Sequence, residues 1–219
     1  MTTTDTLSFT QVEAAGLDDW RQLFSALHTR FRTGDFATGL ALVNAIGALA
    51  EEANHHPDLD LRYPHLNVLL MSHDVFELTA RDVDLARAIS VAAAELGVAA
   101  DPSATSVVEI ALDSPDYEAV KPFWRAVLGL EDSPAHDQEL RDPAGSLPTL
   151  WFQPTDPHDE PRQRFHLDVR VPPEVAESRI AAALAAGGVL VSDERAPAFT
   201  VLADAQGNKA CVTTGRGRE

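Results

Sequence analysis

Hydrophobic and polar residues alternate early in the chain and then change to a helical spacing. Leu27, Thr29 and Phe31 are separated by histidine and arginine, a period of two that predicts a strand with one polar face. Asp35 is a favourable helix N-cap. Apolar residues then recur every three or four positions, so a helix is expected to run from Asp35 to about Ala53.

A second strand and a closing helix complete the pattern of this half. The strand is predicted over residues 66–71. The segment Thr79–Asp82 resembles a capping box, and an apolar stripe continues from it to Leu96. A glycine and a proline follow as helix-stop signals, so we expect a domain over residues 1–97 and a linker over residues 98–104.

The second half of the chain contains an internal repeat. A strand-like run, a turn with proline, an apolar helix and a closing glycine follow Glu109, and the same order follows His166. Short strand-like pieces come after each helix, near residues 150–153 and 201–212. This order predicts two βαβββ units that form one domain over residues 105–219. The whole chain is therefore expected to be of the α+β class.

Composition narrows the class of protein further. Seventeen basic residues stand against 34 acidic ones, a net charge of −17 that is spread over both halves. A field of this sign repels phosphate backbones, so nucleic-acid binding is not expected. No apolar run reaches the roughly 20 residues of a membrane span, and the N-terminus has no secretory pattern. With Cys211 as the one cysteine, these features predict a cytoplasmic protein without disulfides.

The clearest candidates for chemistry are histidines. His55 and His56 precede Pro57, so they should stand at the C-terminal end of the predicted helix, where the helix dipole favours a charged imidazole. Glu51 lies one helical turn before His55 and could orient that ring. His73 follows the second predicted strand. On spacing alone, an acid–base site and an exposed helix end explain this pattern equally well.

A longer pattern resolves this choice through a family resemblance. Its fixed places are Glu51, His55, His56, Pro57, Tyr63, His73 and Asp82. From about residue 8 to residue 97 the chain resembles the pterin-4a-carbinolamine dehydratases. The resemblance implies a small domain with helices on one face of an antiparallel sheet and a cleft for a reduced pterin. These fixed places make up the family signature.

The resemblance also implies an activity. The family dehydrates 4a-hydroxytetrahydrobiopterin to quinonoid dihydrobiopterin, which recycles the cofactor of aromatic amino acid hydroxylases, and the reaction needs no metal or redox cofactor. It implies that His55 and His73 transfer protons and that His56 orients the pterin. Glu51 and Asp82 are then expected to fix the imidazole tautomers. The partners expected are the pterin, a functionally linked hydroxylase and a second copy in a homodimer.

Tyr63 of this signature, and Ser72 directly before His73, are expected to bind the substrate.

Residues of about 105–214 resemble the glyoxalase-like branch of the vicinal oxygen chelate superfamily. The resemblance rests on the repeat and on the segments 123–130, 166–168 and 204–208. Active members hold a divalent metal with one ligand from each of four strands. The corresponding places here are Glu109, Gln153, His166 and Cys211.

Cysteine is unusual beside oxygen and imidazole ligands, so we expect a domain that binds or packs without a metal. The alternative is a live metal site with Glu109 and His166 as ligands. For the whole chain, a pterin dehydratase is the favoured prediction, and a vicinal oxygen chelate metalloenzyme or a non-enzymatic regulatory protein are the alternatives.

Overall fold

The computed structural model describes residues 5–105, 107, 109–157, 167–171 and 173–214. The chain divides into two compact units, Met1–Val107 (unit 1) and Val108–Glu219 (unit 2). Each has its own hydrophobic core.

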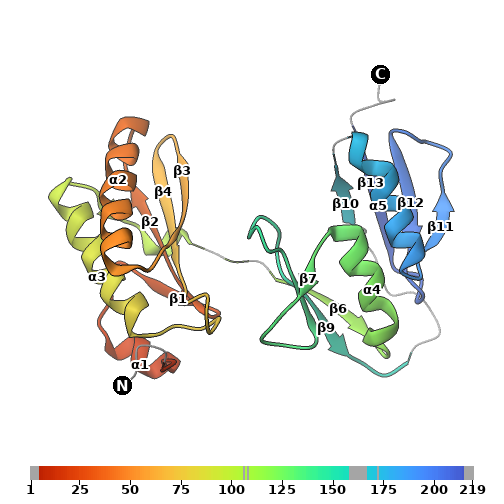
Figure 1. Cartoon of the computed structure of the whole chain (residues 1–219), viewed down its shortest axis with the longest axis horizontal. Helices are drawn as coiled ribbons and strands as arrows, with labels where there is room; N and C mark the ends of the chain where they lie inside the picture. Colours follow the sequence, from red (N-terminus) through yellow and green to blue (C-terminus); the bar gives the residue numbers. More distant parts are fainter. Residues whose placement is uncertain (1–4, 106, 108, 158–166, 172, 215–219) are drawn as a thin grey trace. The chain divides into compact units, whose positions relative to one another are not determined.

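Unit 1 has helices on one face of an antiparallel sheet, as Figure 1 shows. The strand order is β1-β2-β4-β3, with β5 paired to the far end of β2. This arrangement confirms the expected α+β domain. The strands are β1 (Arg21–Leu23), β2 (Ala26–Arg32), β3 (Asp58–Arg62), β4 (His65–Leu70) and β5 (Ala99–Ala100). The helices are α1 (Phe9–Ala14), α2 (Phe36–Ala53) and α3 (Ala80–Glu95).

Alternation along the strands creates the core of unit 1. Leu27, Thr29 and Phe31 are all buried under the helices, and the polar residues between them lie on the open face. Asp35 caps α2 through a bond from the Thr38 backbone, as its sequence position predicts. The Trp20 indole, just before β1, is buried and donates a hydrogen bond of 3.1 Å to Ser90 of α3.

Helix α2 is long and apolar enough to cross a membrane by length and composition. Its inner positions Leu42, Ile46 and Ala50 are instead buried in the core of unit 1. A core helix passes the same test, so this observation gives weak support for a membrane span.

The structure corrects the prediction of a linker over residues 98–104. Residues 98–104 are part of unit 1, because Gly97 adopts a positive φ of 70° and turns the chain back onto the sheet. Val98 is buried, and β5 then pairs with the end of β2. The division between the units comes later, at Val107 and Val108. Gly97 therefore marks a tight reversal of the chain, and the proline begins the short 3-10 helix η1 (Pro102–Ala104) after β5.

Unit 2 consists of two βαβββ repeats, as the sequence repeat predicts. The two sheets have the same order, β6-β9-β8-β7 and β10-β13-β12-β11, each with a parallel pair on one side. The first repeat is β6 (Ile110–Ser114), α4 (Tyr117–Leu128), β7 (Glu131–Asp132), β8 (Glu139–Arg141) and β9 (Leu150–Pro154). The second is β10 (Leu167–Arg170), α5 (Pro173–Ala185), β11 (Val189–Ser192), β12 (Phe199–Ala203) and β13 (Lys209–Thr213).

A buried polar contact joins the two repeats of unit 2. The Trp124 indole of α4 is 2% exposed and donates a hydrogen bond of 2.9 Å to Asp204, in the turn between β12 and β13. The other Asp204 oxygen accepts from the backbone of Asn208, which shapes the turn. One carboxylate therefore both forms a hairpin and holds the helix of the other repeat.

Candidate active site

The two adjacent histidines point in different directions because of how α2 ends. Asn54 adopts a left-handed conformation with φ 46°, which stops the helix after Ala53. The His55 backbone then donates to the Ala50 carbonyl, 3.1 Å away. As a result the His55 ring is buried, with 6% of its side chain exposed, whereas 55% of the His56 side chain is exposed.

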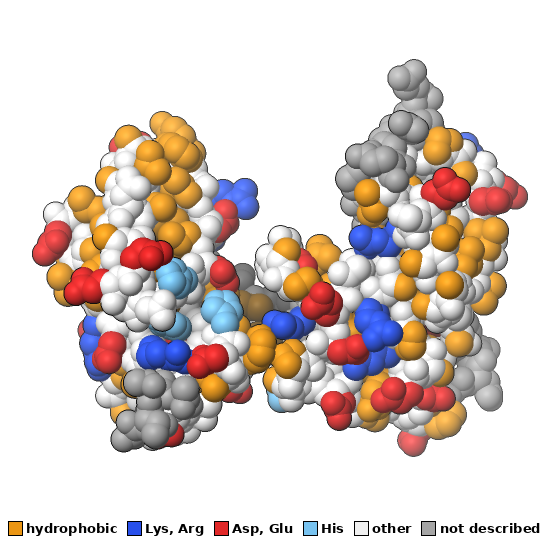
Figure 2. Space-filling model, viewed as in Figure 1, with side chains coloured by type: hydrophobic (Ala, Val, Ile, Leu, Met, Phe, Trp, Pro, Cys, Tyr) orange, Lys and Arg blue, Asp and Glu red, His pale blue; other side chains and the backbone are white. Residues whose placement is uncertain are grey.

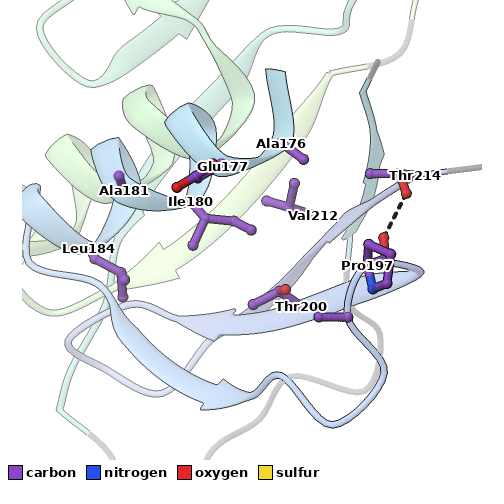
Figure 3. Close-up of a pocket in the computed structure, with 10 residues that line it drawn as sticks. Ala176, Glu177, Ile180, Ala181, Leu184, Pro197, Thr200, Val212 and Thr214 are labelled. Atoms are coloured by element: carbon purple, nitrogen blue, oxygen red, sulfur yellow. Dashed lines mark hydrogen bonds between the residues drawn. The ribbon is translucent and has the colours of Figure 1, made fainter. Parts of the chain in front are cut away.

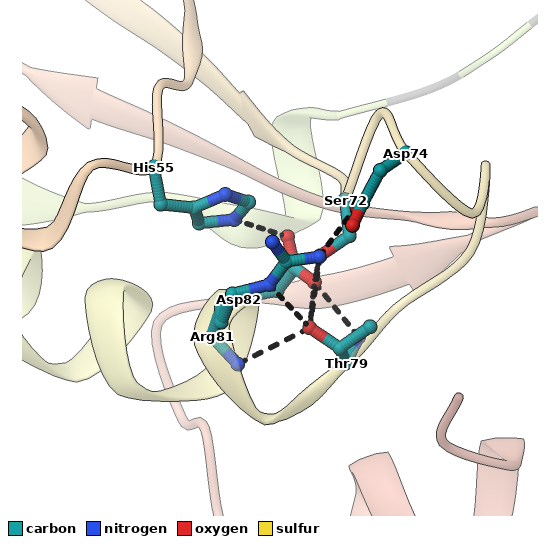
Figure 4. Close-up of polar contacts among 6 residues, drawn as sticks. All are labelled: His55, Ser72, Asp74, Thr79, Arg81 and Asp82. Atoms are coloured by element: carbon teal, nitrogen blue, oxygen red, sulfur yellow. Dashed lines mark hydrogen bonds and ion pairs between the residues drawn. The ribbon is translucent and has the colours of Figure 1, made fainter. Parts of the chain in front are cut away.

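Asp82 is the fully buried partner of His55. It belongs to the predicted capping box of α3, and its Oδ2 accepts a 2.8 Å hydrogen bond from the Thr79 backbone. Its Oδ1 lies 2.7 Å from His55 Nε2 (Figure 4). A single carboxylate thus links the C-terminal end of α2 to the N-terminal end of α3, which fixes the position of the imidazole.

Ser72 belongs to the same buried network. Its hydroxyl donates to Asp82 Oδ2 at 2.7 Å and lies 2.8 Å from the Thr79 hydroxyl. Ser72 has no exposed surface, so its side chain is not placed to contact a substrate, contrary to expectation. The serine is a positioning residue that holds Asp82, together with Thr79, in place.

Glu51 pairs with His56 rather than with His55. Its Oε1 lies 3.1 Å from His56 Nε2, and both side chains are largely exposed. The predicted Glu51–His55 pair is wrong, because the one-turn spacing holds only inside a helix and the chain leaves the helix at Asn54.

His73 lies in the turn after β4, between Ser72, which bonds to Asp82, and Asp74, which pairs with Arg81. The turn is closed by Ser72, whose carbonyl accepts from the Phe76 backbone at 2.8 Å. Arg81, next to Asp82, forms an ion pair with Asp74 (Figure 4). The hydrogen bond from Arg81 holds the pKa of Asp74 below its usual value. The turn that carries the exposed His73 therefore lies close to the buried imidazole.

Histidine side chains gather on one face of unit 1, next to acidic and basic ones (Figure 2). The topology brings His55, His56 and the turn of His73 to one end of the sheet. His55 and His56 come just before β3 and His73 comes just after β4, and these two strands are antiparallel neighbours. In such a pair, the beginning of β3 and the end of β4 lie side by side at the same end of the sheet.

Tyr63, which was expected to contact the substrate beside the histidines, does not lie in this cluster. It lies in the turn between β3 and β4, with 70% of its surface exposed. The length of β4 separates that turn from His73, roughly 15–20 Å at about 3.4 Å per residue.

Sequence reasoning missed Asp74 and Arg81, which no part of the family signature marks. An arginine directly before the capping aspartate was the available signal.

In unit 2 the expected metal ligands form no site that the described residues reveal. Among those residues, no group of three or more histidine, cysteine or acidic side chains could hold an ion. Burial, and then repulsion by Glu139, raises the pKa of Glu109. Gln153 donates to the neighbouring Pro154 carbonyl. Cys211 is buried, and His166 lies outside the described residues.

Comparison with known families gives one match for each unit. Residues 5–92 match the family described as pterin 4 alpha carbinolamine dehydratase, and residues 109–213 match the glyoxalase-like domain.

Two curated relatives, each named "Putative pterin-4-alpha-carbinolamine dehydratase", match the first of these regions. The protein of Thermosynechococcus vestitus is 40% identical over 80 residues, 36% of this chain and 84% of the relative. That of Nocardia farcinica is 37% identical over 89 residues, 40% of this chain and 94% of the relative.

Solved structures resemble each unit. A transcriptional coactivator/pterin dehydratase from Brucella melitensis covers 41% of this chain and 99% of its own, with 26% identity and a TM-score of 0.39. A glyoxalase/bleomycin resistance protein/dioxygenase family enzyme from Burkholderia phytofirmans covers 50% of this chain and 98% of its own. Its identity is 16% and its TM-score is 0.40.

Proposed function

Because the chain belongs to the pterin-4a-carbinolamine dehydratase family through unit 1, with a glyoxalase-like domain as unit 2, we propose that unit 1 dehydrates 4a-hydroxytetrahydrobiopterin. The observation that supports this proposal most directly is the buried His55–Asp82 pair beside the turn that carries His73. It provides one imidazole of fixed orientation and one that solvent and substrate can reach.

The reaction requires two proton transfers. The C4a–O bond breaks with its electron pair on oxygen, the oxygen takes up a proton and leaves as water, and the adjacent ring nitrogen gives up a proton. The carboxylate of Asp82 accepts a hydrogen bond from His55 Nε2, which leaves the lone pair of Nδ1 free to take the ring proton. His73 is exposed and is assigned to protonate the leaving oxygen. Each transfer contributes about 10²–10⁴-fold to the rate.

His56 is assigned to orient the pterin, with Glu51 as its partner. The pair is exposed, so its contribution to stability is small, and its distance of 3.1 Å suits a hydrogen bond that fixes the ring. Tetrahydrobiopterin recycling, a functional link to an aromatic amino acid hydroxylase, a homodimer and a cytoplasmic location complete this proposal.

We propose that unit 2 serves as a binding domain without a metal. Cys211, which stands where a carboxylate is expected, supports this view. Elemental analysis of the dialysed protein tests it: stoichiometric zinc, iron, manganese or nickel would favour the metalloenzyme with Glu109 and His166 as ligands.

The test of the dehydratase is the stopped-flow decay of chemically generated carbinolamine in the presence of the full chain. His73→Ala and His55→Ala should each lower kcat/KM by about 10²–10⁴-fold. His65→Ala is the matched control, because His65 begins β4 at the opposite end of the strand from the cluster, and it should keep the wild-type rate.

His73 is exposed, so its variant separates catalysis from folding; circular dichroism checks that His55→Ala still folds. A wild-type protein that does not accelerate the decay, or a folded His73→Ala protein at the wild-type rate, would refute the proposal.

A further inference from the structure

Unit 2 contains a cavity of about 370 Å³ between α5 and the strands β12 and β13 (Figure 3). On the helix side it is lined by Ala176, Ile180 and Leu184. On the sheet side, Thr200 and Val212 form part of the wall. A volume of this size falls within the range of about 300–1,000 Å³ that small-molecule pockets occupy.

The difference between the two repeats explains the cavity. The fourth and eighth residues of α4 are Val120 and Trp124, which are buried to 0% and 2% exposure. The same positions of α5 hold Ala176 and Ile180, which are only partly buried. Smaller side chains at matching helix positions leave space between helix and sheet.

The cavity and Cys211 lie on opposite faces of the sheet that contains β12 and β13. Thr200 and Val212 are paired in register on β12 and β13, and both face α5. Cys211 is the neighbour of Val212 along the strand, so its side chain projects from the opposite face of the sheet. A ligand under α5 would therefore lie on the opposite side of the sheet from the Cys211 side chain.

The residues that line the cavity indicate which kind of ligand it would bind. Apolar side chains form most of the wall, and the described part of the chain provides no hydrogen-bond partner for the Thr200 hydroxyl. The Thr214 hydroxyl, by contrast, donates to the Pro197 carbonyl. Glu177 also lines the cavity; it is exposed, and none of the described residues forms an ion pair with it. This carboxylate, in a protein of net charge −17, favours a cation over an anion.

We propose that this cavity binds a compact aromatic amine, with the ring against Ile180 and Val212, a ring donor on Thr200 and the ammonium group near Glu177. The site is independent of the dehydratase reaction and lies within unit 2.

Isothermal titration of the full chain with three ligands of one ring tests the charge preference. Tryptamine, indole and indole-3-acetate carry a positive, a neutral and a negative group, and affinity should fall in that order. Glu177→Gln should weaken tryptamine roughly twofold to fivefold, as expected for an exposed ion pair, and leave indole unchanged.

Filling the cavity tests its location. Ile180→Trp places at the eighth position of α5 the residue that α4 has there, and it should lower tryptamine affinity at least tenfold. Ala176→Val is the smaller change, chosen in case tryptophan overpacks the site, and it should raise Tm while it weakens binding. Ala182→Val, on an exposed position of the same helix, is the matched control and should bind as wild type does.

Saturable binding of tryptamine that both filled variants weaken supports the site. Equal affinity for tryptamine and indole-3-acetate, or wild-type affinity in a folded Ala176→Val or Ile180→Trp protein, would overturn it.

Discussion

Asp82 makes several contacts that no sequence pattern of this length could assign together. It caps α3 through Thr79, accepts from Ser72 and orients His55. The sequence predicts the capping role and, through the family signature, a role beside the histidines. The hydrogen bond from Ser72 to Asp82 depends on the turn after β4. That turn brings the Ser72 hydroxyl within 2.7 Å of a carboxylate ten residues later in the chain. Such contacts follow from tertiary structure and not from spacing.

The Asp74–Arg81 pair gives a prediction about pH. Since the folded-state pKa of Asp74 is lowered from 3.8, its contribution to stability is present above that value and is lost as the pH falls through the lower, folded-state pKa. Asp74→Asn should therefore lower the free energy of unfolding at neutral pH. In acid, the free energies of unfolding of the variant and the wild type should become equal. Urea unfolding at several pH values measures this.

Asp84→Asn is the control for that experiment, because Asp84 is an exposed carboxylate on α3 whose ion pair is longer, at 3.4 Å. A difference between wild type and Asp74→Asn that stays constant across the acid range would contradict the assignment. The same ion pair holds the turn of His73, so the variant should also lower kcat with little change in KM.

At the scale of elements, the strongest periodic patterns gave the right structure. The strand around Leu27 and the helices that follow Asp35 and Thr79 all lie where the sequence places them. Strand β3 was not predicted, because it is only five residues long and follows Pro57 directly; its residues 58–62 alternate between exposed and partly buried positions. The error at residues 98–104 arose because a chain reversal and a domain end share the same local signals.

The end of α2 carries a prediction of its own. Asn54 turns the chain in a left-handed conformation, which sends His55 inward and His56 outward. Asn54→Ala should lower the free energy of unfolding by roughly 1 kcal/mol, since alanine does not adopt this conformation readily. Asn54→Gly should be close to wild type. Urea denaturation compares the two, and equal losses would show that the conformation at this residue has no energetic role.

For the whole molecule, the separate cores predict that unit 1 works by itself. A fragment of residues 1–107 should keep the dehydratase rate of the full chain. A fragment of residues 1–97 lacks the buried Val98 and strand β5, and it should be less stable by about 2 kcal/mol, the value of one buried valine. Thermal and urea unfolding of both fragments checks this, and equal stability would restore the boundary at residue 97.

The placement of the tryptophans has a practical consequence for following the units one at a time. Trp20 is the sole indole of unit 1, and Trp124 and Trp151 belong to unit 2. Trp20 is enclosed beside Ser90, as Trp124 is beside Asp204, so each unit has a fluorophore whose emission shifts when its own core opens. In a Trp20→Phe protein, intrinsic fluorescence would report the melting of unit 2 alone, while the wild-type trace would contain both.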